Sequence, residues 1–571
     1  MAQCIKNGVL RPRLFGLIAL GLICWPLAAS SAQSQERIQN AAIAAAHPLA
    51  TEAGYEVLKK GGNAFDAAIA VAAALAVVEP YASGLGGGGF WLLHRAADGR
   101  QVMLDARETA PAQASAGMYL DEQGRIIPKA SLRGPKAAAI PGIPAALGHL
   151  AKHYGKLLLA ASLAPAIRYA DSGVPVDARY IAICRRFNSQ LTGNARRLFL
   201  DYGSVPQQGF VLRQKALAAT LRSIAFGGSE IFYRGKAARE MVQAVRSAGG
   251  IWVLADLEKY RVIEREPLRF SYRSLQITAA PLPSAGGLSL AQSLNILERL
   301  PYVGADDEGK AHFVVEALRR AYQDRARYLG DADFVNVPAA RLLSQEYAAS
   351  RAMTIDAYRA TPSRELEEET AVINEGDNTT HFSIVDSEGN WVAATLSINT
   401  PFGSGFVAGG TGVLLNNEMD DFSAAPGAPN TYRLQSYSGN EIAPGKRPLS
   451  SMSPTFVEDE RGILILGTPG GSRIISAVLL AVLDYENRAQ VDLQEMLRAP
   501  RYHHQYLPDR VEIEPESFSL KWIANLQSRG YVVAESGRRW GNMQAVYIDK
   551  RSGRAMAAND PRGQSGGPGE N

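Results

Sequence analysis

The chain has 571 residues, 46% of them hydrophobic and 20% charged, which is the composition of a globular protein long enough for three or four domains. Its formal net charge is +4, and Lys6, Arg11 and Arg13 stand in a first segment without acidic residues, so the rest of the chain is close to neutral. A body without a basic surplus gives no electrostatic case for a nucleic-acid partner.

The first predicted element is an export signal over residues 1–32. Its basic residues precede the apolar run Leu14–Trp25, and small residues follow up to Ala32. The run is too short for a stable membrane span, so we expect cleavage after Ala32 and a soluble periplasmic or secreted protein, with an uncleaved anchor as the alternative. Removal of the signal leaves only Cys184, which excludes an intrachain disulfide and fits a bacterial periplasm.

Two helices are predicted next, over residues 50–60 and 64–78. Asn63 caps the second helix, and Asp66 stands at its third position. Residues 64–78 are apolar on nearly every face, which predicts a helix buried in the core. A glycine run, 84–89, then precedes strand-like residues; because no Gly-Lys-Ser/Thr follows it, we expect close backbone packing or an active-site backbone role there, not a nucleotide site.

Helical periodicity dominates the middle of the chain, and β-type alternation begins at Thr379. The predicted helices cover 145–153, 214–225, 236–247, 285–299, 308–328 and 474–484, and the predicted strands cover 380–386, 390–397, 411–416, 453–458 and 462–467. Between the two regions, the acidic run Glu365–Glu369 is expected to be a solvated loop. The glycine-rich tail after Arg562 is expected to be disordered.

The junction between Asn378 and Thr379 carries most of the chemical information. A turn-prone stretch meets the pair Thr379-Thr380 there, at the start of a strand. If the Asn378–Thr379 bond breaks, Thr379 carries a hydroxyl nucleophile and a free α-amine, whose pKa of about 8 suits it as the general base. The hydroxyl makes the cut by attacking the preceding carbonyl, through an ester that water hydrolyses. On the residues alone, a threonine pair at a strand start usually reflects β-propensity only.

Seven ordered motifs stand out between residues 61 and 473. They are Gly61-Gly-Asn-Ala-Phe-Asp66, Gly86-Gly-Gly-Gly-Phe90, Asp105-Ala-Arg-Glu-Thr-Ala-Pro111, Thr379-Thr-His-Phe-Ser-Ile-Val-Asp386, Leu415-Asn-Asn-Glu-Met-Asp-Asp-Phe422, Lys446-Arg-Pro-Leu-Ser-Ser-Met-Ser-Pro454 and Pro469-Gly-Gly-Ser-Arg473. With them the chain resembles the γ-glutamyltransferase family of N-terminal-nucleophile hydrolases over nearly its whole mature length. The resemblance implies an α+β fold, a four-layer αββα sandwich formed jointly by both products of self-cleavage.

The resemblance also implies catalytic roles. Thr379 is the expected nucleophile of both self-cleavage and turnover. Ser397 stands where the family usually has a threonine whose hydroxyl contacts the new α-amine, and serine keeps that hydroxyl. Gly470 and Gly471 are expected to offer backbone N–H groups to an oxyanion, and a glycine pair before a predicted helix suits that role because the donors lie near the positive helix end. A plain turn is the alternative for the glycines, and a polar strand residue for Ser397.

A γ-glutamyl group carries a free carboxylate and a free ammonium, and a selective pocket must bind both. The residues that the resemblance assigns are Arg107, Ser450 and Ser451 for the carboxylate, and Asn399, Glu418 and Asp421 for the ammonium. A guanidinium matches a carboxylate bidentately. Many bacterial relatives have glutamine at the Glu418 position, so we expect some extra pH dependence here. Without the resemblance, Arg107 would be interpreted as a member of a surface ion pair, and the residues of the 415–422 run as parts of a turn.

Two further features bear on the site. Residues 426–432 match a lid loop of the family, with Tyr432 as its aromatic gate, and this predicts a preference for small γ-glutamyl compounds over long polymers. The pair His503-His504 is expected to be structural, because adjacent histidines point different ways and no ligand set accompanies them. We expect neither a metal nor a cofactor.

The sequence thus predicts a self-cleaving γ-glutamyl enzyme that acts on glutathione and passes the γ-glutamyl group to water or to an amino acid or peptide. The mature form is expected to be a heterodimer of residues 33–378 and 379–571. The alternatives are an acylase for glutaryl-type cephalosporin side chains, which lack the ammonium that Glu418 and Asp421 suit, and a non-catalytic exported binding protein that never cuts itself.

Overall fold

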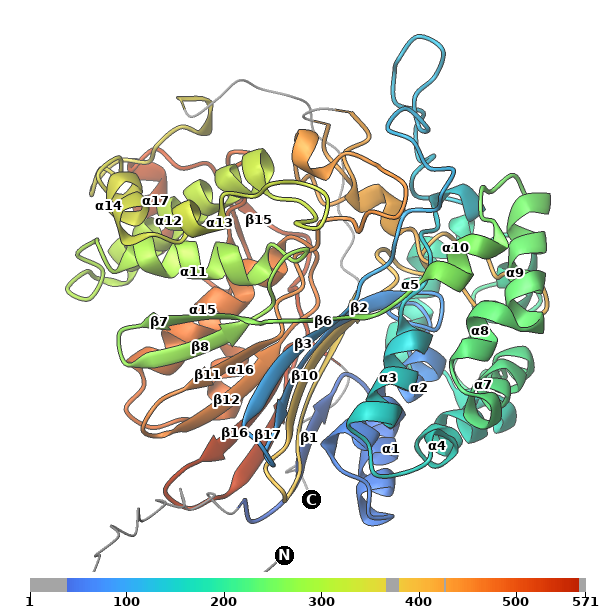
Figure 1. Ribbon diagram of the computed structural model, residues 1–571. Helices are drawn as coiled ribbons and strands as arrows, with labels where there is room; N and C mark the ends of the chain where they lie inside the picture. The colour runs from blue at the N-terminus through green and yellow to red at the C-terminus, as the bar shows by residue number, and fades with distance from the viewer. Residues whose placement is uncertain (1–37, 366–378, 426–427, 564–571) are drawn as a thin grey trace, which may run out of the picture. The chain divides into compact units, whose positions relative to one another are not determined.

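The computed structural model describes residues 38–365, 379–425 and 428–563, and its strands form two six-stranded sheets (Figure 1). All neighbours within the first sheet are antiparallel. In spatial order its strands are β1 (Ala42–Ala45), β9 (Thr380–Val385), β10 (Trp391–Ser397), β2 (Gly88–Arg95), β3 (Arg100–Ala106) and β6 (Ile263–Arg265). The strands that follow Thr379 are therefore inserted between strands that precede it.

The second sheet is also antiparallel throughout and also combines both parts of the chain. Its spatial order is β17 (Ala555–Asn559), β16 (Gln544–Asp549), β12 (Gly462–Gly467), β11 (Thr455–Glu458), β8 (Leu275–Ala279) and β7 (Leu268–Tyr272). Smaller ladders pair β4 (Val174–Pro175) with β5 (Val211–Leu212), and join β13 (Tyr502–His503), β14 (Val511–Ile513) and β15 (Val533–Glu535).

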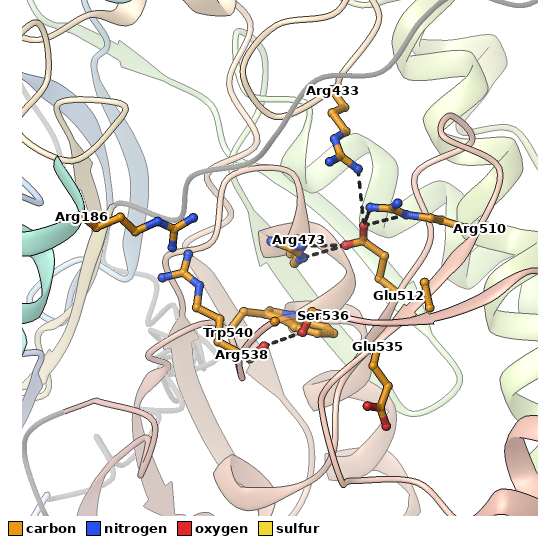
Figure 2. Close-up of a pocket in the computed structure, with 11 residues that line it drawn as sticks. Arg186, Arg433, Arg473, Arg510, Glu512, Glu535, Ser536, Arg538 and Trp540 are labelled. Atoms are coloured by element: carbon orange, nitrogen blue, oxygen red, sulfur yellow. Dashed lines mark hydrogen bonds and ion pairs between the residues drawn. The ribbon is translucent and has the colours of Figure 1, made fainter. Parts of the chain in front are cut away.

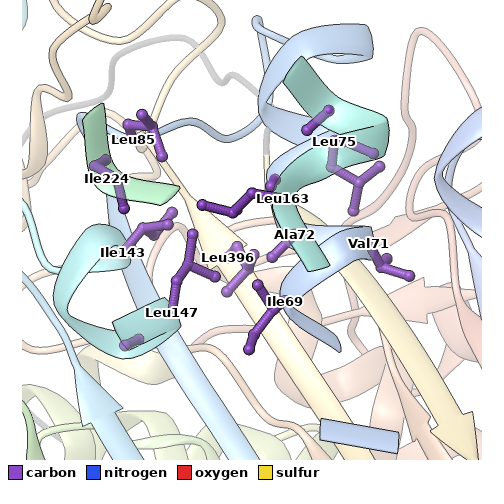
Figure 3. Packing of buried hydrophobic residues seen from close by; sticks show 14 of the residues in the cluster. Ile69, Val71, Ala72, Leu75, Leu85, Ile143, Leu147, Leu163, Ile224 and Leu396 are labelled. Carbon is purple, nitrogen blue, oxygen red and sulfur yellow. The ribbon is translucent and has the colours of Figure 1, made fainter. Parts of the chain in front are cut away.

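Helices cover the outer face of the first sheet. They include α1 (Pro48–Lys59), α2 (Ala64–Val78), α3 (Ile143–His153), α4 (Leu159–Ser172), α7 (Lys215–Gly227) and α9 (Lys236–Ser247). Figure 3 shows side chains of α2, α3 and α4 packed against Leu396 of β10. Alternate strand residues share this core, so that Trp91 and Leu93 face the helices while Phe90 and Leu92 face the other way.

A second core fills the space between the two sheets and extends to the helices beyond. Phe90 and Leu92 of the first sheet join Phe456 and Ile465 of the second in one buried cluster. The same cluster includes residues of α11 (Gly286–Leu297), α12 (Asp307–Tyr328) and α15 (Arg473–Asn487), which Figure 1 shows beside the second sheet. The remaining helices are α5 (Ala178–Phe187), α6 (Gly193–Phe199), α8 (Glu230–Arg234), α10 (Leu254–Lys259), α13 (Ala339–Leu342), α14 (Gln345–Ala352), α16 (Leu493–Arg498) and α17 (Leu520–Ser528).

Most predicted elements are confirmed. Helix α2 has the predicted bounds and is buried at every position, and Asn63 and Asp66 form a capping box. The glycine run packs its backbone against Ser397 and Leu414, as expected of residues without a side chain. The predicted strand 411–416 is wrong: the segment turns at Gly412, whose φ is +73°, and makes only isolated bridges.

Three other predictions fall outside the described residues. They are the export signal, most of the acidic run and the end of the glycine-rich tail. In the described part of the chain, no helix combines the length and apolar character needed to cross a membrane.

Candidate active site

Thr379 directly precedes β9, a strand inside the first sheet, and its side chain is buried. The neighbouring strand β10 ends at Ser397, whose Oγ lies 3.2 Å from Thr379 Oγ1. Ser397 Oγ also accepts a hydrogen bond from the Asn399 N–H at 2.8 Å, which holds the hydroxyl beside the threonine. The expected contact of Ser397 with an α-amine stays a prediction, since the observed one is with the hydroxyl. Asn378 lies outside the described residues.

One pocket brings together nearly all the predicted site residues. Its lining includes Thr379, Ser397, Gly471, Arg107, Asn399, Glu418, Asp421, Tyr432, Ser450 and Ser451. Gly470 lines an adjoining cavity of about 390 Å³, to which Thr379 also belongs. Thr379 therefore stands at the border of two spaces, with a glycine of the predicted pair on each side.

The glycine pair stands just before α15, a helix of 15 residues, so its backbone lies near the positive end of the helix dipole. Gly470 and Gly471 have φ values of +141° and +56°. A Cβ on Gly471 would overlap the ring of Tyr432. The Tyr432 hydroxyl donates a hydrogen bond to the Asn399 carbonyl at 2.7 Å, which ties the tyrosine to the end of β10.

The loop that carries Tyr432 packs on the 418–421 turn. Asn430 Nδ2 donates to Asp421 Oδ1 at 3.0 Å, and the Thr431 N–H donates to Asp420 Oδ2 at 2.9 Å. Residues 426–427 of the predicted lid are outside the described residues. The described part of the loop thus covers the acidic end of the pocket.

Arg107 lies at that acidic end, fully buried beside three carboxylates. Its Nη1 is 2.8 Å from Glu418 Oε2 and 3.5 Å from Glu108 Oε2, and its Nη2 is 2.5 Å from Asp421 Oδ2. Burial alone would lower the pKa of Arg107, but the carboxylates outweigh burial and raise it. Arg107, the residue predicted to bind the substrate carboxylate, therefore contacts both acids predicted to bind the ammonium.

Three carboxylates around one guanidinium leave a surplus of negative charge. Burial raises the pKa of Glu108 to about 7, against the opposing effect of Arg107. The pKa of Glu418 is raised well above its ordinary value, first by burial and then by the charges of Glu108 and Asp421. Both shifts favour the protonated forms of these two acids, and a cation that enters the pocket would favour their ionised forms.

Arg325 is a pocket residue that the sequence reasoning missed. It projects from α12, is 3% exposed, and places Nη2 3.4 Å from Ser451 Oγ. Within the described residues, its Nε and Nη1 have no hydrogen-bond partner. Burial lowers its pKa to about 10, so it is still charged at neutral pH. The available signal was a charged pair, Asp324-Arg325, inside the predicted helix 308–328.

The other predicted ligands line the same pocket. Ser450 Oγ accepts a hydrogen bond from the Met452 N–H at 3.1 Å. Asn399 has a φ of +72°, an uncommon backbone conformation for a non-glycine residue, and its Nδ2 donates to the Asn417 carbonyl at 3.0 Å. The conformation of Asn399 turns the chain where β10 ends, which brings its backbone carbonyl to the Tyr432 hydroxyl.

The histidine pair lies outside this pocket. His503 Nδ1 is 2.8 Å from Ser476 Oγ, and His504 Nε2 is 3.3 Å from Asp509 Oδ1. Burial lowers the pKa of each ring to about 4, so both are neutral at physiological pH. Among the residues that the structure describes, no group of histidine, cysteine, aspartate and glutamate side chains is arranged to hold a metal ion.

Comparison with known proteins decides the family. The model of the gamma-glutamyltranspeptidase family matches residues 50–569. The chain belongs to this family. It is 40% identical over 551 residues to a glutathione hydrolase proenzyme of Pseudomonas sp. (strain A14), covering 94% of this chain and 95% of that protein. A glutathione hydrolase proenzyme of Escherichia coli (strain K12) is also 40% identical, over 532 residues, with 92% and 91% covered.

The α+β fold of this gamma-glutamyltranspeptidase family member recurs in a solved structure. The crystal structure of cephalosporin acylase from Bacillus halodurans superposes with a TM-score of 0.80 at 30% identity, covering 92% of this chain and 95% of that one. The predicted family and the α+β class are thus confirmed. Acylases and glutathione hydrolases share this architecture, so the side chains of the pocket must decide between the two activities.

Proposed function

We propose that the chain is an exported, self-cleaving γ-glutamyltransferase and glutathione hydrolase. The observation that carries the proposal is the composition of one pocket: Thr379 stands at one end, and groups that match both charges of an amino acid stand at the other. A γ-glutamyl amide fits this arrangement because its scissile carbonyl is separated from its α-carbon by two methylene groups.

At the amino-acid end, the acids and the arginines have different tasks. Glu418 and Asp421 face the ammonium, and Arg107 holds the two acids in place while contributing positive charge. Arg325, with Ser450 and Ser451, offers donors to the carboxylate, and its two unsatisfied nitrogens are a reason to assign it this role. A buried guanidinium without a carboxylate partner is costly, and a bound carboxylate would offset that cost.

Self-cleavage comes first in this mechanism. The Thr379 hydroxyl attacks the carbonyl of Asn378, the peptide C–N bond breaks, and the acyl group moves from nitrogen to oxygen. Water then hydrolyses the ester, which leaves an Asn378 carboxylate and a free Thr379 amine. Ser397 lies within hydrogen-bond distance of the attacking oxygen and positions it. The proenzyme names of the two glutathione hydrolase relatives support processing of this kind.

Turnover uses the same hydroxyl. The Thr379 amine takes the hydroxyl proton, the oxygen attacks the γ-carbonyl, and N–H groups of Gly470 and Gly471 stabilise the oxyanion. The C–N bond breaks and the leaving amine takes the proton, so that a γ-glutamyl ester of Thr379 remains. Water then releases glutamate, or the amine of an amino acid or peptide accepts the γ-glutamyl group.

The proposal extends to the form of the mature protein. We infer that residues 33–378 and 379–571 stay together as a heterodimer after removal of residues 1–32, in the periplasm or outside the cell. The two cores support an αββα sandwich, since one joins helices to the first sheet and the other joins both sheets to further helices.

A glutaryl acylase is the second candidate, favoured by the acylase relative of similar structure. A pair of chromogenic substrates separates the two activities: γ-glutamyl-4-nitroanilide and glutaryl-4-nitroanilide differ only in the α-ammonium. We expect the first to be cleaved far faster, and faster still when glycylglycine is added as acceptor. Preference for the glutaryl compound would instead make the protein an acylase.

The same preparation tests processing. A denaturing gel should show two fragments, and N-terminal sequencing of the smaller should begin at Thr379. The Thr379→Ala variant should give one band and no turnover. A single band from active native protein would contradict the mechanism, and a single band from inactive protein would favour the binding-protein alternative.

A further inference from the structure

A buried carboxylate, that of Glu512, contacts the residue that follows the proposed oxyanion turn (Figure 2). Glu512 belongs to β14, and its Oε2 accepts hydrogen bonds from Arg473 Nε at 3.2 Å and from Arg473 Nη2 at 2.7 Å. Arg473 is the first residue of α15 and stands two positions after Gly471. Strand β14 thus reaches the turn that carries Gly470 and Gly471. Neither step of the proposed mechanism uses this acid.

The backbone of Arg473 closes the same turn. Its N–H donates to the Gly470 carbonyl at 3.0 Å, and the Ser472 carbonyl accepts a hydrogen bond from the Tyr322 hydroxyl of α12. Glycines have no side chain by which neighbours could anchor them, and their backbone is the most permissive of all residues. The direction of the N–H groups of Gly470 and Gly471 therefore depends on what holds Ser472 and Arg473.

The side chain of Arg473 is held from two directions. Its guanidinium lies over the ring of Trp540, 5.0 Å from the ring centre, while its donors meet Glu512. Burial raises the pKa of Glu512, but the neighbouring cations, Arg473 first, outweigh burial and lower it to about 2, so the carboxylate is ionised at neutral pH. A buried ion pair adds little net stability because lost hydration offsets the attraction, but its hydrogen bonds fix the direction of the guanidinium.

The other oxygen of Glu512 faces the loop of Tyr432. Oε1 lies 4.0 Å from Nη1 of Arg433, the residue that follows Tyr432. Figure 2 shows the guanidinium groups of Arg433 and Arg473 pointing at Glu512 from two different segments. Because the ring of Tyr432 packs against Gly471, the two oxygens of one carboxylate lie next to the two segments that meet in that contact.

We propose that Glu512 is a positioning residue for turnover: through Arg473 it holds the turn of Gly470 and Gly471 so that their N–H groups meet the developing oxyanion. The inference rests on the proposed function and adds a residue to it. A displacement of about 1 Å in a reacting geometry can cost about a hundredfold in rate, so release of Arg473 should lower kcat. Binding of the α-ammonium and the α-carboxylate should be unaffected, because the groups that bind them belong to other segments.

The variant Glu512→Gln keeps the shape of the side chain and removes its charge. With processed protein and γ-glutamyl-4-nitroanilide, we expect kcat to fall by between about tenfold and a hundredfold. Fragment formation should keep its native rate, because self-cleavage as proposed does not use the glycine pair. Arg510→Gln is the matched control: Arg510 Nε donates to Oε1 of the same carboxylate at 2.9 Å, so its loss leaves the bonds to Arg473 in place, and kcat should stay native.

Two inhibitors separate oxyanion stabilisation from binding at the amino-acid end. Norvaline has a methyl group in place of the γ-carboxyl group of glutamate, so it can occupy the amino-acid end only. The analogue with a boronic acid at that position can add the Thr379 hydroxyl and place an anionic oxygen beside the glycine pair. In Glu512→Gln the inhibition constant of the boronate should rise by about tenfold or more, as kcat/KM falls, while that of norvaline stays unchanged.

A double-mutant cycle tests whether Glu512 acts through Arg473. Arg473→Gln alone should lower kcat to a similar extent, and its combination with Glu512→Gln should be no worse than Arg473→Gln. Losses that multiply would contradict this route. If Glu512→Gln does not yield folded protein, Arg473→Lys takes its place with the same expectations, because lysine keeps the charge but not the pair of donors.

Native kcat in Glu512→Gln would overturn the inference and leave the proposed function standing. Equal losses of boronate and norvaline binding, or fragment formation slowed as much as turnover, would also overturn it, because they would indicate general damage to the fold. Failure of the native protein to cleave γ-glutamyl-4-nitroanilide would overturn the proposed function and this inference with it.

Discussion

The ring of Tyr432 occupies the space that a Cβ on Gly471 would need. The tyrosine is held there from two sides, because its hydroxyl donates to the Asn399 carbonyl at 2.7 Å and its own carbonyl accepts from Gln505 Nε2 at 3.0 Å. Gly471 contributes one of the two N–H groups proposed for the oxyanion. The position of the loop tyrosine and the position of that donor are therefore linked.

This contact predicts the effect of Gly471→Ala. The added methyl group must displace either Tyr432 or the Gly471 N–H, and the positive φ of Gly471 adds backbone strain. We expect kcat to fall by about a hundredfold or more, as when one oxyanion donor is lost. Tyr432→Gly in the same chain should restore part of kcat by opening the space; no recovery would show that backbone strain alone causes the loss.

Substitutions of Ser397 should slow self-cleavage and turnover only when they remove its hydroxyl. Ser397→Ala removes the group 3.2 Å from Thr379 Oγ1 and leaves the buried threonine without that partner, so self-cleavage and turnover should both slow by roughly tenfold to a hundredfold. Ser397→Thr keeps the hydroxyl with fewer rotamers and should stay close to native. Fragment formation over time on a denaturing gel measures the first step. Equal rates for the alanine and threonine variants would contradict this role.

Arg325 is predicted to bind the substrate carboxylate. Arg325→Met should raise KM for γ-glutamyl-4-nitroanilide by about tenfold to a hundredfold, the loss of a charge-assisted hydrogen bond, with little change in kcat. With 4-aminobutyryl-4-nitroanilide, which has no such carboxylate, native and variant should be alike. Arg327→Gln is the control, since Arg327 is exposed on the same helix. A similar loss on both substrates would mean that Arg325 is only structural.

Glu418 should make donor binding depend on pH. Burial and the neighbouring carboxylates raise its pKa well above the ordinary value, and a bound ammonium favours the ionised form. Binding therefore releases a proton, and KM should fall as pH rises, by up to about tenfold per unit below that pKa. In Glu418→Gln no such proton is released. The measurement is KM of the native protein divided by KM of the Glu418→Gln variant, determined between pH 5 and 8. Titration of the Thr379 α-amine affects both proteins and cancels in this ratio. A ratio that does not change with pH would refute the assignment.

Much of the fold follows from local pattern. Helix α2 was predictable to the residue because an uninterrupted apolar run begins at a capping box. Strands β16 and β17 were missed although they pair with each other across a short turn, and β17 consists mainly of alanine, which has low β-propensity. The segment 411–416 has strand-like residues, but its backbone at Gly412 leaves the extended region.

The residues of the candidate site also differ in whether a local sequence pattern or only the tertiary structure reveals them. Thr379 and the glycine pair belong to contiguous motifs, so the family resemblance indicates them from the sequence, although the residues alone also suit β-propensity and a plain turn. Arg325 enters the pocket only because α12 packs beside the loop of Ser451, a contact between residues 126 positions apart. The ion pairs of Arg107 with Glu418 and Asp421 likewise depend on tertiary structure, which is why the sequence placed these groups on separate tasks.

The insertion of β9 and β10 between β1 and β2 determines when the sheet must form and how the two fragments stay together. Both sheets must be assembled while the polypeptide is still continuous, because the nucleophile acquires its neighbours only in the finished sheet. Once the junction is cut, neither fragment can leave without unzipping ladders on both of its sides. The two fragments of one molecule therefore pair at folding and do not exchange afterwards. When two batches of processed protein with different isotope labels are mixed and left together, mass spectrometry should detect no molecule that combines fragments of both batches.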